Sequence, residues 1–149
     1  MINRELKHVK IVFKLDVDAD GYPPSEFEGV WATPLGEDRF RIDNVPFFVK
    51  AVANGDVVRA IKNSDGEFIF DEIVERGGHS TVRIFVTEEG DREAIRLAIK
   101  ELGCDSEASH IKRLCSVDIP PSIPYKNIKK VLDAWEADGR IEYEEGCIY

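Results

Sequence analysis

The sequence predicts an α+β protein in which a small antiparallel β-barrel-like sheet packs with a C-terminal split βαβ layer. Two observations carry this prediction. Before the double glycine Gly77-Gly78, apolar and polar residues alternate in short runs separated by turn signals, which is typical of half-buried strands. Beyond that double glycine, two segments carry apolar residues at helical spacing, and further strand-like runs surround them.

The barrel prediction rests on residues 8–70. Residues 8–17 alternate apolar positions with polar ones that include lysines, and Pro23-Pro24 ends this strand because proline offers no hydrogen-bond donor to a sheet. Residues 27–34 resume strand character. The stretch 39–70 contains further turns at residues 54–56 and 63–66 and supplies the middle of the barrel. We expect about five short strands before the double glycine.

The C-terminal half follows the order β-α-β-β-α-β. Gly103 is a good end for the first helix, and Pro124 suits the first turn of the second. This order predicts a ferredoxin-like layer. The chain then divides into a β-barrel-like subdomain over residues 1–78 and a ferredoxin-like α+β subdomain over residues 79–149. The expected elements are a strand at 81–86, a helix at 91–102, strands at 107–113 and 114–119, a helix from about 124, and a strand at 140–149.

The predicted core consists of large apolar residues at inward positions of these elements. We expect these residues to be mostly buried, including Phe47, which lies in a dense apolar run of the barrel stretch. The predicted core residues are Phe13, Trp31, Phe40, Phe47, Val57, Phe68, Ile84, Ile95, Ile99, Val131 and Trp135.

Net charge and cysteine usage limit the classes of function. The formal net charge of −9 disfavours binding to nucleic acid, which requires Lys and Arg at the phosphates, so a protein partner is expected to be basic. No apolar run approaches the ~20 residues of a membrane helix, and the start does not look like a signal peptide, so we expect a cytoplasmic protein. Cys104, Cys115 and Cys147 are odd in number and form no close pair, which favours buried, reduced thiols.

Two acidic segments are candidates for a partner-binding surface. The first is a proline-stiffened stretch, whose carboxylates would lose less conformational entropy on binding; the second lies near the end of the chain. Either segment could form the binding face, and a solvated surface that keeps the protein soluble is the alternative explanation for both. The candidate residues are Asp16, Asp18, Asp20, Glu26 and Glu28 in the first segment, and Glu136, Glu142, Glu144 and Glu145 in the second.

Two motifs suggest a metal site, and both fail on spacing. The residues from Asp16 to Gly21 reproduce the start of an EF-hand calcium loop, but Phe27 stands where a bidentate glutamate should close the coordination. Cys104, His110 and Cys115 carry zinc-compatible atoms at a spacing that matches no recurrent zinc pattern. We therefore expect no metal and no cofactor.

A third motif suggests catalysis. His79 beside Ser80, after two glycines, could supply a base and a nucleophile, but no G-x-S-x-G elbow is present. The double glycine is also explained by a chain reversal between the two halves. We expect no catalytic residue. An enzyme that uses His79 and Ser80 is the alternative, as is a regulatory module that binds a small ligand or nucleic acid.

Four motifs resemble a family of bacterial proteins of about this length that is labelled a domain of unknown function. The motifs are Trp31, Asn44-Val45-Pro46-Phe47, Gly55-Asp56-Val57-Val58 and Gly77 with His79-Ser80. The label implies no activity. By analogy with other small acidic bacterial proteins, we expect an immunity protein that neutralises a nuclease-type toxin by stoichiometric binding.

Overall fold

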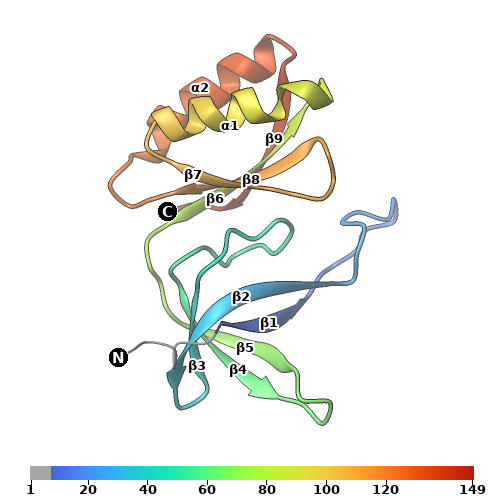
Figure 1. Cartoon of the computed structure of the whole chain (residues 1–149), viewed down its shortest axis with the longest axis vertical. Helices are drawn as coiled ribbons and strands as arrows, with labels where there is room; N and C mark the ends of the chain where they lie inside the picture. Colours follow the sequence, from blue (N-terminus) through green and yellow to red (C-terminus); the bar gives the residue numbers. More distant parts are fainter. Residues whose placement is uncertain (1–7) are drawn as a thin grey trace.

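The computed structural model describes residues 8–149, which form a β-barrel and a second sheet that carries two helices (Figure 1). This combination is of the α+β class, as predicted. The elements are β1 (Val9–Lys14), β2 (Phe27–Gly36), β3 (Arg39–Ile42), β4 (Val57–Lys62), β5 (Phe68–Glu75), β6 (Ser80–Val86), the short 3-10 turn η2 (Glu89–Asp91), α1 (Arg92–Glu101), β7 (Asp105–Ala108), β8 (Leu114–Ile119), α2 (Tyr125–Ala137) and β9 (Ile141–Cys147).

Strands β1 to β5 close into the barrel, and the two-residue period of a strand explains its interior. In β1, Ile11 and Phe13 are buried, whereas Lys10 and Lys14 are exposed. Consecutive strands pair antiparallel, but β1 pairs with β5 in parallel. The prediction of an antiparallel barrel is therefore wrong at this one seam, because a meander with an odd number of strands brings its first and last strands together in the same direction.

The second sheet has the strand order β7-β8-β6-β9, and each neighbouring pair in it is antiparallel. Its two helices cover one face (Figure 1). Each helix buries apolar residues four positions apart: Ile95 and Ile99 in α1, and Ile128 and Leu132 in α2. Strand β7 lies earlier than the predicted 107–113, because residues 109–113 form the turn into β8.

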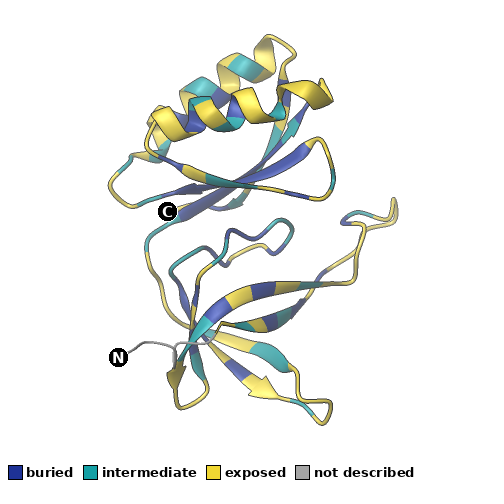
Figure 2. Ribbon diagram, viewed as in Figure 1, coloured by how far each residue is buried: buried dark blue, intermediate teal, exposed yellow. Residues whose placement is uncertain are grey.

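Burial corrects part of the predicted core (Figure 2). Phe13, Phe40, Val57, Ile84, Ile95 and Ile99 are buried as predicted. Trp31, however, is 43% exposed on the outer face of β2. Phe47, Phe68, Val131 and Trp135 are partly buried, with exposures between those of the core and of the surface.

The long connection between β3 and β4, here called the junction loop (residues 43–56), joins the two halves of the molecule. It has no strand, although its sequence lies within the predicted barrel stretch. Figure 1 shows the loop between the barrel and the face of the second sheet that carries no helices. Side-chain contacts connect the loop to that face: for example, Asn44 Nδ2 donates to Glu107 Oε1 at 2.7 Å, and Ser116 Oγ donates to the Val45 carbonyl at 3.0 Å.

The three cysteines are free and buried, as predicted. Burial raises the pKa of Cys104 and of Cys115 to about 11, so both thiols are protonated at neutral pH. Among residues 8–149, neither helix has the length and the apolar composition needed to cross a membrane.

Candidate functional site

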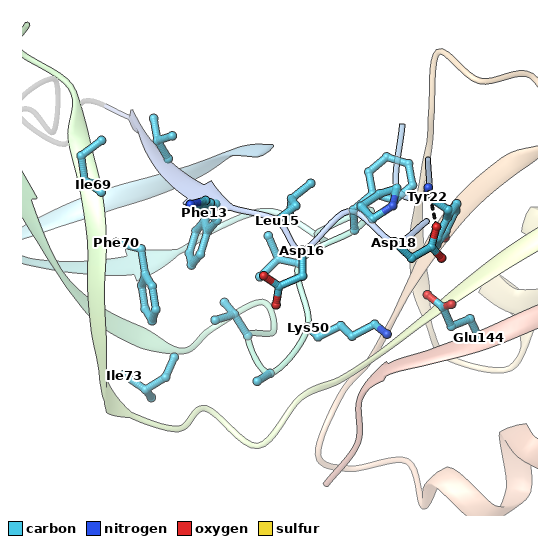
Figure 3. Close-up of a pocket in the computed structure, with 17 residues that line it drawn as sticks. Phe13, Leu15, Asp16, Asp18, Tyr22, Lys50, Ile69, Phe70, Ile73 and Glu144 are labelled. Carbon is cyan, nitrogen blue, oxygen red and sulfur yellow. Dashed lines mark hydrogen bonds between the residues drawn. The ribbon is translucent and has the colours of Figure 1, made fainter. Parts of the chain in front are cut away.

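A cavity of about 570 Å³ lies where the open end of the barrel meets the second sheet (Figure 3). Its walls come from β1, from the segment that follows β1, from the junction loop, from β5 and from β9. A cavity of this size is within the range of small-molecule sites. The lining residues are Val12, Phe13, Lys14, Leu15, Asp16, Asp18, Tyr22, Pro23, Phe48, Val49, Lys50, Ala51, Val52, Ile69, Phe70, Ile73 and Glu144.

The cavity has an apolar end and a charged end. In Figure 3, Phe13, Phe70 and Ile73 lie at the end formed by the barrel. Lys50 and Glu144 lie at the opposite end, near the segment that follows β1. A ligand that filled this space would therefore need an apolar part and a charged or polar part.

The two predicted acidic segments meet at the charged end. Asp16 and Asp18 come from the first segment and Glu144 from the second, and all three line the same cavity. We call these three residues the inner carboxylates. Both predicted segments therefore contribute side chains to the lining of one cavity.

The other predicted acids lie outside the cavity lining. Asp20, Glu26 and Glu142 belong to the same two segments and are exposed, and we call them the outer carboxylates. Glu136 is exposed on α2. Glu145 accepts a hydrogen bond from the Tyr125 hydroxyl at 2.5 Å.

Glu28 does not belong to the acidic surface at all. Its carboxylate accepts the backbone N–H groups of Phe47, Phe48 and Val49 at 2.7, 2.9 and 2.8 Å. These amides belong to the junction loop, where no strand partner is available to them. Glu28 therefore holds the part of the loop that lines the cavity, and its charge is used inside the fold.

Arg83 holds the same loop segment from the other side. Its side chain is fully buried, and its guanidinium donates to the carbonyls of Phe47 and Val49. Its Nη1 also lies 3.3 Å from Glu144 Oε1. Burial lowers the pKa of Arg83, and the charge of Glu144 opposes that shift. Glu144 therefore links the cavity to this buried cation.

Tyr22 is a polar lining residue that the sequence did not single out. Its hydroxyl oxygen is buried and has no hydrogen-bond partner among the described residues. Burial raises the pKa of Tyr22, as do the negative charges of Glu144 and Asp18, while Arg83 acts in the opposite direction. The phenol is therefore a neutral group whose hydroxyl oxygen is shielded from solvent.

The His79 and Ser80 pair lies elsewhere, at the junction between the two halves. His79 Nδ1 lies 2.8 Å from Asp118 Oδ1, and burial raises the pKa of Asp118 whereas its hydrogen bond with His79 lowers it. A Cβ on Gly55 would lie 3.2 Å from the imidazole Cδ2, so the ring sits in a packed turn. Ser80 is buried, and its Oγ accepts the Tyr149 amide at 2.8 Å. His79 therefore has a carboxylate partner, Asp118, whereas the Ser80 hydroxyl is bonded to the backbone of Tyr149 and not to His79.

The motifs that carry the family resemblance meet at the same junction. Asn44 Oδ1 accepts the Trp31 amide, and Asp56 accepts the amides of Ala53 and Gly77. A side chain on Gly77 could not fit, because its Cβ would lie 2.7 Å from the Gly55 carbonyl oxygen. Asn44, Asp56 and Gly77 therefore serve to hold the junction loop against its neighbours.

The acids that resembled a calcium loop form a local turn. Asp18 Oδ1 accepts the backbone amides of Asp20 and Tyr22 at 2.9 and 3.0 Å. Within the described part of the chain, no three His, Cys, Asp or Glu side chains are grouped so that they could hold a metal ion.

Comparisons with known proteins found one matching family and one similar solved structure. A family model described as "Domain of unknown function (DUF4265)" matches residues 28–143 and spans both halves of the chain. A solved structure, "Novel crystal structure of a hypothetical protein from Neisseria gonorrhoeae", is similar with a TM-score of 0.72 and 21% identity, over 96% of this chain and 95% of that chain. At this identity the similarity concerns the fold alone. No curated protein matches the sequence.

Proposed function

The chain belongs to the DUF4265 family, and because the family description names no activity, we propose its function from the geometry of the cavity. It is an acidic, non-catalytic binding protein that captures a basic protein at the charged end of this cavity. The observation that carries the proposal is the convergence of Asp16, Asp18 and Glu144, from segments more than a hundred residues apart, on one cavity.

Electrostatics supports a basic partner. The whole chain has a net charge of −9, which favours the approach of a cation at long range. At short range, three carboxylates and the two lysines Lys14 and Lys50 line the cavity. The carboxylates outnumber the lysines, so the lining is complementary to a basic partner. Such complementary charge increases association rates and restricts the choice of partner more than it increases affinity.

An immunity protein is the specific class that we propose. Nuclease-type toxins bind phosphates and therefore have cationic clefts, which an acidic inhibitor can occupy in place of the substrate. The proposal includes a cytoplasmic location, where such a toxin would act on nucleic acid. We also propose that the C-terminal half is the predicted split βαβ, ferredoxin-like layer, which the strand order β7-β8-β6-β9 supports.

The test begins with the product of the adjacent reading frame as bait, followed by measurement of association rates at increasing salt. We expect the rate constant to fall steeply with salt, because the Debye length shrinks from about 10 Å at 0.1 M to about 3 Å at 1 M. The variant Asp16→Asn, Asp18→Asn, Glu144→Gln should bind more weakly and dissociate faster than the wild type.

A matched control separates a site from a general charge effect. The variant Asp20→Asn, Glu26→Gln, Glu142→Gln changes the net charge equally but alters only the outer carboxylates. It should affect the association rate and leave the dissociation rate close to that of the wild type. Equal dissociation rates for both variants, an association rate insensitive to salt, or the lack of any protein partner would contradict the proposed function.

A further inference from the structure

The apolar end of the cavity is a feature that charge alone does not explain. Phe13 and Phe70 stack with ring centroids 4.7 Å apart, and Ile73 extends this wall (Figure 3). Phe48 and Val52 from the junction loop also contribute to the lining. Water gains few hydrogen bonds in a space lined by such groups, so an apolar occupant is favoured there.

The charged end lies beside this apolar wall within the same cavity. The three inner carboxylates outnumber Lys14 and Lys50 in the lining, so the part of an occupant that extends out of the apolar end meets a net negative charge. Burial is the main cause of the raised pKa of Tyr22, and the charges of Glu144 and Asp18 add to it while Arg83 opposes it.

We infer that the cavity binds an aromatic side chain whose immediate neighbour is a cationic group. The ring enters the barrel end against Phe13, Phe70 and Ile73, and the cation remains beside the inner carboxylates. This inference rests on the proposed function and specifies how the basic partner is recognised: by an aromatic residue next to a Lys, an Arg or an N-terminal amine. Buried aromatic anchors of this kind dominate the binding energy of many protein interfaces.

The probe for this inference is 2-phenylethylamine, which carries one ring and one ammonium group. In a titration followed by amide chemical shifts, it should bind in the millimolar range and shift residues of β1, the junction loop and β5. The anion 3-phenylpropanoate has nearly the same shape and the opposite charge. It should bind at least about fivefold more weakly, which corresponds to one Coulomb contact at 4 Å in water.

Two variants test the two ends separately. Replacing all three inner carboxylates by their amides should remove the preference for 2-phenylethylamine, whereas the outer-carboxylate variant should keep it. Ile73→Trp should fill the apolar end and abolish binding of both probes. If Ile73→Trp does not fold, the shift map of the wild-type protein still locates the bound ring.

Three results would overturn the inference: no shifts at the cavity, equal or tighter binding of 3-phenylpropanoate, or probe binding that survives in a folded Ile73→Trp protein. None of them affects the salt-dependent capture of a basic protein, which needs only the carboxylates. Conversely, loss of that capture with retained probe binding would remove the proposed function and leave a site for aromatic cations.

Discussion

Replacing Arg83 by Met should lower the free energy of unfolding by about 3–5 kcal/mol, because each hydrogen bond from a charged group contributes about 1.5–3 kcal/mol. The guanidinium holds two carbonyls of the junction loop, Phe47 and Val49, and no described backbone partner replaces it. Methionine has a comparable length but no donor. The two carbonyls would remain buried and unpaired, and Glu144 would lose its cation.

Urea denaturation measures this effect, and Arg59→Met is its matched control. Arg59 also has a carboxylate partner, with its Nη2 at 3.0 Å from Glu72 Oε2, but both side chains are about half exposed. An exposed ion pair of this kind contributes about 0–1 kcal/mol, so the free energy of unfolding of the control should be close to that of the wild type. Equal losses for the two variants would show that the Arg83 contacts do not hold the junction loop.

Replacing Glu28 by Ala should lower the free energy of unfolding by about 2–4 kcal/mol, because three charge-assisted hydrogen bonds to backbone amides are lost. The loss per bond is smaller than for Arg83, because Glu28 is only partly buried and water can replace part of these bonds. The amides of residues 47–49 have no strand partner that could compensate. Glu28→Gln keeps one acceptor oxygen, so this variant should lose less free energy of unfolding than Glu28→Ala but more than none.

The control for Glu28 lies two residues away. Glu26 is exposed, so Glu26→Ala should change the stability by no more than about 0.5 kcal/mol. In thermal and urea unfolding, Glu28→Ala should therefore be clearly less stable than Glu26→Ala. If Glu28→Ala unfolded like the wild type, the carboxylate would not organise the loop that lines the cavity.

Local patterns predicted the elements of this fold well. The alternation in β1 and the helical spacing of Ile95 and Ile99 depend only on neighbours in the chain. The parallel seam between β1 and β5 and the irregular junction loop depend on how the barrel closes. The loop is also the reason why Phe47 is only half-buried: its backbone, rather than its side chain, is the part that Glu28 and Arg83 hold.

The candidate site was predictable only in part. The acidic segments are visible in the sequence, but their meeting at one cavity requires the long-range packing of β9 beside the segment that follows β1. Two signals could have been used better. Glu28 lies on the same face of β2 as the buried Val30 and Ala32, because the three residues are two positions apart. Arg83 stands between the apolar residues Val82 and Ile84 in the middle of β6.

The central claim is that the two acidic segments form one binding surface around this cavity. Mapping the amide chemical shifts of the protein in complex with its captured basic partner tests this claim most directly. We expect the largest shifts to occur together at Asp16, Asp18, residues 48–52 and Glu144. Shifts confined to one acidic segment, or located on α1 and α2, would contradict the claim.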